Sequence, residues 1–239
     1  MNKYQFKISV VMVCLNAEDF IEKSLKSLAS QTYKDYELIV KDGISKDKTI
    51  DIVNSLSSEF KNIKIISEAD TGIYDAMNQA VAVSSGEYIY FLNAGDLLHS
   101  EVTLENIITQ LDCDIVYGDM ICGGEILKQP DNITLTRFRL ERMLCHQSIF
   151  AKKEWLSEYP FECKFKYCAD RHWLYTCFKN GATFRHINDI VGFYDTTGVS
   201  SDWKNFSADS LKVIKEEFGI SGVIIAKAKR FIGEILGKR

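Results

Sequence analysis

The first hundred residues alternate short apolar runs with segments of helical periodicity, and this alternation constrains the fold more than any other feature. Branched and aromatic residues fill four runs that we predict to be buried strands: 8–14, 36–40, 63–66 and 88–92. The segments between them repeat apolar residues at three- and four-residue intervals, as helices do when one side packs on a sheet. Such alternation predicts right-handed βαβ units and a mostly parallel sheet.

Polar turns follow three of these strands. Asn16 follows the first strand, Asp42 and Gly43 end the second, and residues 93–96 follow the fourth. Because ligands of open α/β sheets bind beyond the carboxyl ends of the strands, we expect a nucleotide cleft there. The first turn has no Gly-x-Gly-x-x-Gly, which disfavours a dinucleotide-binding dehydrogenase, and no phosphate-binding P-loop motif is present.

The second half of the chain is less regular. We expect strands over 114–117 and 121–127, with breaks at Gly118 and at the Gly123-Gly124 pair. We also expect a short apolar segment at 147–150, a helix from about 169 to 178 and a strand over 187–194. Two helices, at 206–218 and from 223 onward, are expected to close the chain.

Composition narrows the class of protein. The chain has 239 residues with 46% hydrophobic residues and a net charge of −4, which is ordinary for a globular protein and gives no reason to expect a nucleic-acid partner. Its seven cysteines form no Cys-x-x-Cys pair, so free thiols in a reducing compartment are expected. Without a recognisable signal sequence or an apolar run long enough to span a bilayer, the expected location is the cytoplasm.

The run from Tyr88 to Asp96 is the most informative for chemistry. It ends in Asn-Ala-Gly-Asp, which presents the Asp96 carboxylate beyond a buried strand. A carboxylate there suits Mg²⁺ or Mn²⁺, and such an ion can neutralise a diphosphate leaving group. The alternative is that Gly95 and Asp96 are turn residues only.

Several segments together resemble the inverting nucleotide-sugar glycosyltransferases of family 2, which have the GT-A fold, especially short bacterial enzymes of surface-polysaccharide synthesis. In the first half, the matching segments are 9–16, 30–40, 42–49, 68–78 and 93–96. In the second half, less specific matches are 145–148, 169–170 and 198–200. The resemblance implies a GT-A-like, Rossmann-type α/β domain over 1–219, with a nucleotide-binding half (1–100) and an acceptor half (101–219).

On the donor side, the resemblance implies that Asp42 accepts hydrogen bonds from a uracil base or ribose. Cys14 and Asn16 would line the same pocket, and Asn93 is assigned to the nucleotide-sugar site as well. Two further aspartates, Asp70 and Asp75, lie at the start of one predicted helix. One of them would face the nucleotide or the donor sugar, and Asp70 is favoured. The alternative is that these two aspartates only cap that helix.

Asp96 corresponds to the metal-binding aspartate of the family. Many relatives carry further aspartates in this turn, whereas this chain has Asn93 and Gly95. Diphosphate and water would therefore supply the other ligands, as Mg²⁺ commonly accepts, and metal binding without nucleotide would be weak.

On the acceptor side, Asp170 resembles the general base that takes the proton from the acceptor hydroxyl. The alternative is that Asp170 caps a helix beside Arg171 and His172, and His172 is a rival proton acceptor. The resemblance further implies that His146 and Gln147 hydrogen-bond to the donor sugar or the acceptor. Residues 195–200 would form a loop over the donor.

The C-terminal segment 220–239 forms a predicted basic amphipathic helix. Apolar residues recur at helical spacing from Ile224 to Leu236, and the whole segment contains five lysines and arginines. Such a helix suits the anionic surface of the inner membrane, on the cytoplasmic face; the alternatives are packing on the catalytic domain or contact in a homodimer.

The resulting functional hypothesis is the transfer of a hexose-type unit from a nucleotide sugar, UDP-linked, to a glycan or polyprenyl-diphosphate-linked acceptor. The pathway would be synthesis of O-antigen, capsule or exopolysaccharide. Two alternatives are a sugar-nucleotide pyrophosphorylase, which ordinarily has a glycine-rich basic loop after the first strand, and a non-catalytic nucleotide-binding subunit.

Overall fold

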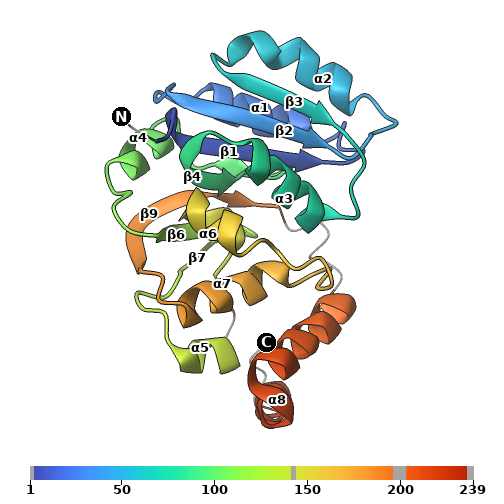
Figure 1. Ribbon diagram of the computed structural model, residues 1–239, viewed down its shortest axis with the longest axis vertical. Coiled ribbons are helices and arrows are strands. Elements are labelled where there is room, and N and C mark those ends of the chain that lie inside the picture. The colour runs from blue at the N-terminus through green and yellow to red at the C-terminus, as the bar shows by residue number, and fades with distance from the viewer. Residues whose placement is uncertain (1–2, 141–143, 196–202, 236–239) are drawn as a thin grey trace.

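The computed structural model describes residues 3–140, 144–195 and 203–235. Within these ranges, one mixed sheet of nine strands forms the centre of the molecule, with helices on both of its faces (Figure 1). The strand order is β3-β2-β1-β4-β8-β6-β9-β5, and β7 pairs with β6. The strands are β1 (Phe6–Cys14), β2 (Tyr36–Asp42), β3 (Ile63–Ser67), β4 (Gly86–Phe91), β5 (Leu97–Leu98), β6 (Ile115–Cys122), β7 (Glu125–Leu127), β8 (Ile149–Lys152) and β9 (Phe184–Tyr194).

Helices connect these strands and cover the sheet. The α-helices are α1 (Ile21–Ala29), α2 (Thr49–Leu56), α3 (Ile73–Val83), α4 (Thr103–Ile108), α5 (Leu135–Leu140), α6 (Lys153–Glu158), α7 (Ala169–Lys179) and α8 (Trp203–Ile235). The short 3₁₀ turns are η1 (Ser57–Glu59) and η2 (His146–Ser148). None of the helices in the described ranges has an apolar stretch that would let it cross a bilayer.

The alternating side chains of β1 show how the two faces are filled. Val10 and Met12 pack in the core beneath α1, α2 and α4, whereas Val11 and Val13 pack beneath α3, α6 and α7. A strand buried on both faces is mostly apolar, and this explains the nearly continuous hydrophobic runs of the first hundred residues.

The predicted elements of the first half are confirmed. β1 pairs in parallel with β2 and with β4, and β2 pairs in parallel with β3. The chain thus moves outward from β1 to β3 and then returns to the other side of β1 with β4. Strand order reverses at β1, and in doubly wound sheets this position forms a ligand-binding crevice. The predicted α/β class with a mainly parallel sheet is confirmed, because the longest pairings are parallel.

In the second half, one expected break is wrong. β6 runs without interruption through Gly118, where its parallel pairing with β9 shifts register. A Cβ atom on Gly118 would lie 2.5 Å from the carbonyl oxygen of Asp189, so this glycine permits close approach of β9 and does not end the strand. The break at Gly123 and Gly124 is confirmed: both residues have positive φ and form the β6–β7 hairpin turn.

The two predicted closing helices lie within α8, on either side of one non-helical residue. Gly219 has φ 67° and ψ −165°, a conformation that favours glycine and changes the direction of the helix. Before this kink, the guanidinium of Arg139 on α5 lies 5.0 Å from the centre of the Phe218 ring.

Candidate active site

The carboxyl ends of β1, β2 and β4 lie at one edge of the sheet. Cys14 and Asp42 are partners in the β1–β2 register, and the turn of residues 93–96 follows β4 directly. The loops after β1 and β2 are joined: the backbone N–H of Lys46 donates to the Asn16 side-chain oxygen at 2.8 Å, and the Asn16 N–H donates to Ser45 at 2.8 Å. Three of the predicted donor-site residues are therefore brought together.

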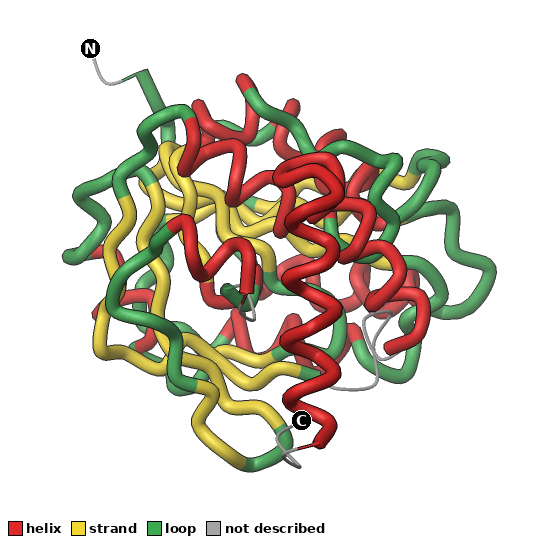
Figure 2. The backbone as a smooth tube through the Cα atoms, turned by 90° about the horizontal axis from the view of Figure 1, so that it is seen from below, coloured by secondary structure: helices red, strands yellow, loops and turns green. Residues whose placement is uncertain are grey.

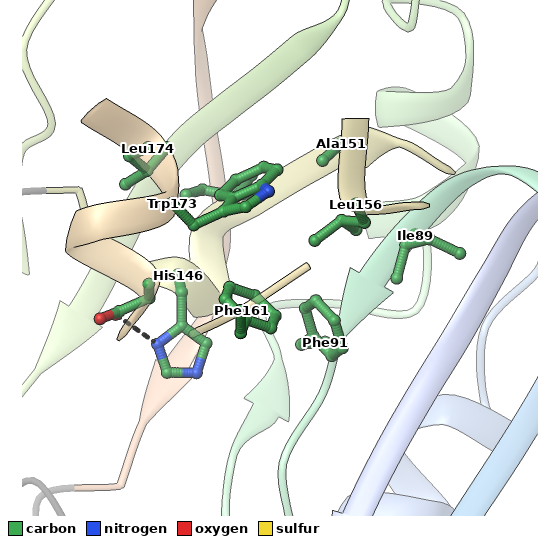
Figure 3. A pocket seen from close by; sticks show the side chains of 10 residues that line it. Ile89, Phe91, His146, Ala151, Leu156, Phe161, Trp173 and Leu174 are labelled. Atoms are coloured by element: carbon green, nitrogen blue, oxygen red, sulfur yellow. Dashed lines mark hydrogen bonds and ion pairs between the residues drawn. The ribbon is translucent and has the colours of Figure 1, made fainter. Parts of the chain in front are cut away.

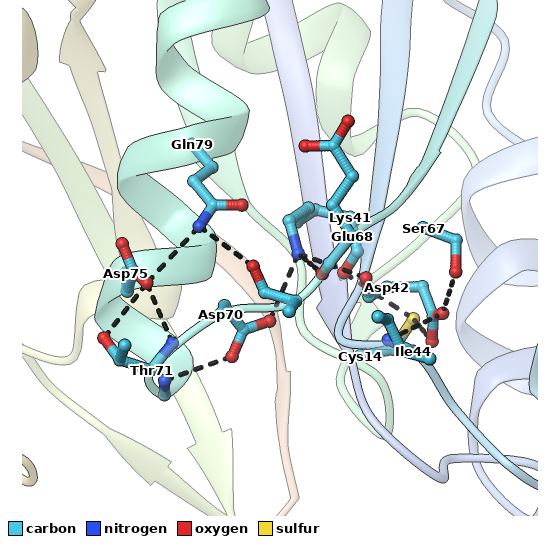
Figure 4. A network of polar contacts seen from close by, with 12 residues as sticks. Cys14, Lys41, Asp42, Ile44, Ser67, Glu68, Asp70, Thr71, Asp75 and Gln79 are labelled. Carbon is cyan, nitrogen blue, oxygen red and sulfur yellow. Dashed lines mark hydrogen bonds and ion pairs between the residues drawn. The ribbon is translucent and has the colours of Figure 1, made fainter.

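Asp42 is fully buried, and both of its carboxylate oxygens accept hydrogen bonds from other groups of the protein. One carboxylate oxygen accepts hydrogen bonds from the Ser67 hydroxyl at 2.6 Å and from the backbone N–H of Ile44 at 3.1 Å (Figure 4). The other accepts from the hydroxyl and the backbone N–H of Ser45. These bonds hold the loop after β2, where Ile44 has a positive φ of 65°. Direct contact of Asp42 with a base stays a prediction.

Cys14 lies behind this carboxylate. Its sulfur is 4.0 Å from Asp42, and burial, followed by the negative charge of Asp42, raises the pKa of the Cys14 thiol to about 12. The thiol is therefore protonated at neutral pH. Such a thiol can fill the wall of a base pocket but cannot act as a nucleophile.

A buried lysine, which sequence reasoning missed, ties the donor-side loops together. The Lys41 side chain has no exposed surface, and its ammonium group donates to the carbonyl of Glu68 at 2.6 Å, to that of Asp42 at 3.1 Å and to the Asp70 carboxylate at 3.1 Å (Figure 4). A charge that interrupts an otherwise apolar strand was the sequence signal. This contact places Asp70 beside the loop after β2, at the same edge as the other donor-site residues.

Asp75 is occupied in the first turn of α3. Its carboxylate accepts from the backbone N–H of Thr71 at 2.8 Å and from the Thr71 hydroxyl at 3.0 Å (Figure 4). The backbone hydrogen bond from Thr71 is the largest cause that lowers the pKa of Asp75. These contacts give Asp75 the capping role that was the alternative to ligand binding. Asp70 also accepts from the Gly72 backbone N–H at 3.1 Å, but its contact with Lys41 places it beside the loop after β2, so it stays the favoured candidate.

Asp96 lies in the turn after β4 and is 3% exposed. One carboxylate oxygen accepts from the backbone N–H of Asp195 at 2.8 Å, and the Gln147 side chain lies beside the carboxylate. Burial, only partly opposed by the hydrogen bond from Asp195, raises the pKa of Asp96 to about 6. A buried carboxylate whose pKa is raised in this way is a common property of functional sites.

Asp195 brings a second carboxylate to this turn. Antiparallel pairing of Leu97 with Phe193 carries the end of β9 past Gly95, where a Cβ atom would lie 2.5 Å from the Asp195 carboxylate. Gly95, with φ 109°, thus makes room for a distant aspartate in a turn that lacks a second acid of its own. The position of Asp195 directly after the predicted strand 187–194 was the sequence signal that could have identified it. The rest of the loop that was expected to cover the donor, 196–200, lies outside the described residues.

Asp170 lies in the first turn of α7 and contacts two side chains that are distant in the sequence. The Tyr74 hydroxyl donates to one of its oxygens at 3.0 Å, and His146 Nδ1 lies 3.1 Å from the other. Burial by itself would raise the pKa of Asp170, but the hydrogen bonds from His146, Arg171 and Tyr74 hold it below the ordinary value. Asp170 is therefore ionised at neutral pH and able to accept a proton.

His146 also contacts the turn after β4. Its Nε2 lies 3.2 Å from the side-chain nitrogen of Asn93. If Nδ1 carries the proton and donates to Asp170, Nε2 accepts from Asn93, so a neutral imidazole satisfies both contacts. The predicted contact of His146 with the donor sugar or the acceptor stays a prediction; the geometry adds a contact that orients Asp170.

The turn η2 joins the two acidic sites. Its first residue, His146, contacts Asp170 and also Asn93 in the turn of Asp96, and its second residue, Gln147, lies beside Asp96. The apolar side chains of Phe91, Phe161 and Trp173 line a small recess beside His146 and Asp170 (Figure 3). The two carboxylates, predicted as metal ligand and base, thus lie around one centre.

A second group of ionisable residues lies apart from this centre. Glu162, His172 and Glu216 have their ligand atoms within 4.8 Å of one another, but the Lys164 ammonium lies 2.5 Å from Glu162 and 2.7 Å from Glu216. The Lys164 ammonium therefore already neutralises the two carboxylates, as a metal ion would. His172 is engaged there, so Asp170 is the better candidate for a proton acceptor.

Known proteins resemble this chain over most of its length. The profile described as "Glycosyl transferase family 2" matches residues 9–157. A "PGL/p-HBAD biosynthesis glycosyltransferase" of Mycobacterium tuberculosis is 32% identical over 197 residues, which are 80% of this chain and 77% of that protein. A "Poly(ribitol-phosphate) beta-glucosyltransferase" of Bacillus spizizenii is 34% identical over 120 residues, 48% of this chain and 19% of that protein.

Solved structures share the fold. The crystal structure of Staphylococcus aureus TarS 1–349 in complex with UDP matches with a TM-score of 0.67 and 20% identity over 88% of this chain and 66% of that one. A mannosyltransferase from Pyrobaculum calidifontis in complex with GDP-Man and Mn²⁺ matches with a TM-score of 0.68 and 16% identity over 97% of this chain and 76% of that one.

Proposed function

Because this chain belongs to glycosyl transferase family 2, we propose that it transfers a sugar from a UDP-linked donor to a glycan or lipid-linked hydroxyl, with inversion. The observation that carries the proposal is that His146, in η2, contacts both Asp170 and Asn93, a residue of the turn that holds Asp96. Direct displacement at an anomeric carbon needs a group that stabilises the departing diphosphate and a base near the incoming hydroxyl. The names of the relatives support a place in cell-surface glycan synthesis.

The donor half would bind the nucleotide at the ends of β1 and β2. Cys14 and Asn16 would line the base pocket, Asp42 would hold its loop in shape, and Asp70, fixed by Lys41, would face the ribose or the sugar. TarS with bound UDP supports this choice of nucleotide.

A divalent ion, Mg²⁺ or Mn²⁺, fits the oxygen donors at Asp96. Asp96 would hold the ion, with Asp195 close by and the diphosphate and water completing the ligands. When bound, the ion would neutralise the negative charge that develops on the diphosphate. The fold neighbours with Mn²⁺ support this choice of metal.

On the acceptor side, Asp170 would take the proton from the attacking hydroxyl. Tyr74 and His146 hold both of its oxygens, so one rotamer of the carboxylate is fixed before the acceptor binds. Displacement of an α-linked donor from the opposite face would give a β-linked product.

The proposal is tested with a panel of nucleotide sugars, measuring UDP release with and without Mn²⁺ and then transfer to lipid-linked or glycan acceptors. We expect metal-dependent release from one UDP-sugar that accelerates when the matching acceptor is added. Formation of UTP and sugar 1-phosphate when pyrophosphate is added would instead identify a pyrophosphorylase. UDP binding with no turnover on any donor would identify a nucleotide-binding subunit.

Tyr74 is expected to act as a positioning residue. Tyr74→Phe removes one hydrogen bond to the ionised Asp170, and bonds to charged groups contribute about 1.5–3 kcal/mol. We expect kcat to fall about 10-fold, with KM for the donor unchanged and the pKa of Asp170 raised, because the lost bond favoured the charged form. Steady-state kinetics and a carboxyl NMR titration measure these effects.

Tyr88→Phe is the matched control for Tyr74→Phe. Tyr88 is equally buried and its hydroxyl donates to the carbonyl of Cys113 at 2.6 Å, away from the site. This variant should lose stability but keep its kcat. Equal losses of kcat in the two variants would show that Tyr74 has a structural role only.

A further inference from the structure

The part of α8 after Gly219 carries large apolar side chains that are exposed on the surface of the protein. Ile220, Ile224, Ile225 and Phe231 are 69%, 62%, 45% and 64% exposed. Exposed apolar residues are common one at a time, but four within twelve positions of one helix form a patch.

Helical geometry places these residues on one side. Ile220, Ile224 and Phe231 are four and seven positions apart and form a single stripe, which Ile225 widens. Ala226, two positions after Ile224, lies on the opposite side of the helix and is 6% exposed. The helix therefore packs on the protein through a small residue and turns its large apolar residues outward.

The position of this segment agrees with an outward-facing surface. After the kink at Gly219, α8 runs across the outside of the molecule, on the face nearest the viewer in Figure 2. The large apolar side chains are therefore exposed to water, which is unfavourable unless another surface covers them.

The charged residues beside the apolar stripe indicate what kind of partner fits this surface. Lys227 and Lys229 are exposed and fall on the two flanks of the apolar stripe. Segment 219–239 contains five basic residues and one acidic residue, a net charge of +4, whereas the whole chain has −4. Apolar side chains flanked by lysines match a bilayer surface, where the former enter the acyl region and the ammonium groups contact anionic headgroups.

We propose that the outward face of α8 after Gly219 docks on an anionic membrane surface. The helix would lie in the interface plane, because none of the described helices is able to span a bilayer. This inference rests on the helix alone and is independent of the transfer reaction.

The test is co-sedimentation of the full-length protein with lipid vesicles. We expect binding to phosphatidylcholine vesicles that contain about one third phosphatidylglycerol, little binding to pure phosphatidylcholine, and weaker binding as salt is raised. The double variant Ile224→Asp, Phe231→Asp should bind the anionic vesicles at least about 10-fold more weakly, because it removes apolar contact and adds negative charge.

Ile126→Asp is the matched control, since Ile126 is 53% exposed on β7 and lies outside α8. It should bind vesicles as the unchanged protein does. Thermal unfolding and UDP binding of both variants establish that they are folded.

Three outcomes would overturn the proposal: no binding to anionic vesicles, equal binding to neutral vesicles, or equal loss in the Ile126→Asp control. Sedimentation velocity addresses the alternative occupant. If the unchanged protein is a dimer that the double variant dissociates, and neither binds vesicles, the face contacts a second copy of the chain.

Discussion

Replacing Asp170 with Asn is expected to slow sugar transfer by about 10²- to 10⁴-fold, the usual contribution of a general base. The amide has nearly the same shape and can still accept hydrogen bonds from Tyr74 and the Arg171 backbone, so the fold should be retained. It cannot take a proton from the acceptor hydroxyl. Binding of UDP with Mn²⁺, measured by calorimetry, should change little, because Asp170 acts on the acceptor side.

Asp119→Asn is a matched control within the same chain. Asp119 is also buried and lies 2.9 Å from a histidine, His186, in a pair formed between β6 and β9. Its replacement disturbs a comparable Asp–His contact and should lower stability, while transfer stays within about twofold. If Asp170→Asn turned over normally, the base assignment would be wrong.

Replacing Asp96 with Asn is expected to produce the second large effect. Loss of the charged oxygen should weaken Mn²⁺-dependent UDP binding and lower transfer at least about 100-fold, since a bound ion contributes several kcal/mol of charge stabilisation. Calorimetry with UDP in the presence and absence of Mn²⁺ measures the first effect directly, without turnover. Asp112→Asn, which removes only an exposed partner of Arg185, should leave both quantities unchanged.

The pKa of Asp96 gives this variant a pH signature. A proton competes with the ion for the carboxylate, and burial raises that pKa to about 6. Metal-dependent UDP binding by the unchanged protein should therefore weaken as pH falls through 6, about 10-fold for each further unit. Asp170, whose pKa is lowered, stays ionised over this range, so the acidic limb of activity should follow Asp96. A binding profile that is flat from pH 7 to pH 5 would contradict this account.

The sequence predicted the first half of the fold because its signals are local. Each strand from β1 to β4 is a mostly apolar run, and polar turns follow β1, β2 and β4 closely. The second half depends on contacts between distant residues: β8 enters between β4 and β6, and β5 is only two residues long and pairs with β9. Gly118 suggested a break because glycine weakens a strand, whereas its lack of a side chain is what β9 requires.

The site shows the same division. Asp96 and Asp170 could be proposed from motifs, but their partners could not. Tyr74 contacts Asp170 across 96 positions, and the Asp195 backbone contacts Asp96 across 99. No periodicity or composition carries information about such pairs, because the tertiary fold alone brings them together. Lys41 was visible as a charge in a buried strand, but its partners were not.

One short turn, η2, has a consequence for how this protein can be altered. Neighbouring side chains of a single 3₁₀ turn lie against Asp170 and beside Asp96, so neither carboxylate can be displaced without disturbing the surroundings of the other. Exchanges within this tripeptide should therefore show strong epistasis with changes at both carboxylates. A search for new acceptor preference would do better to leave these three positions fixed and vary the surrounding walls.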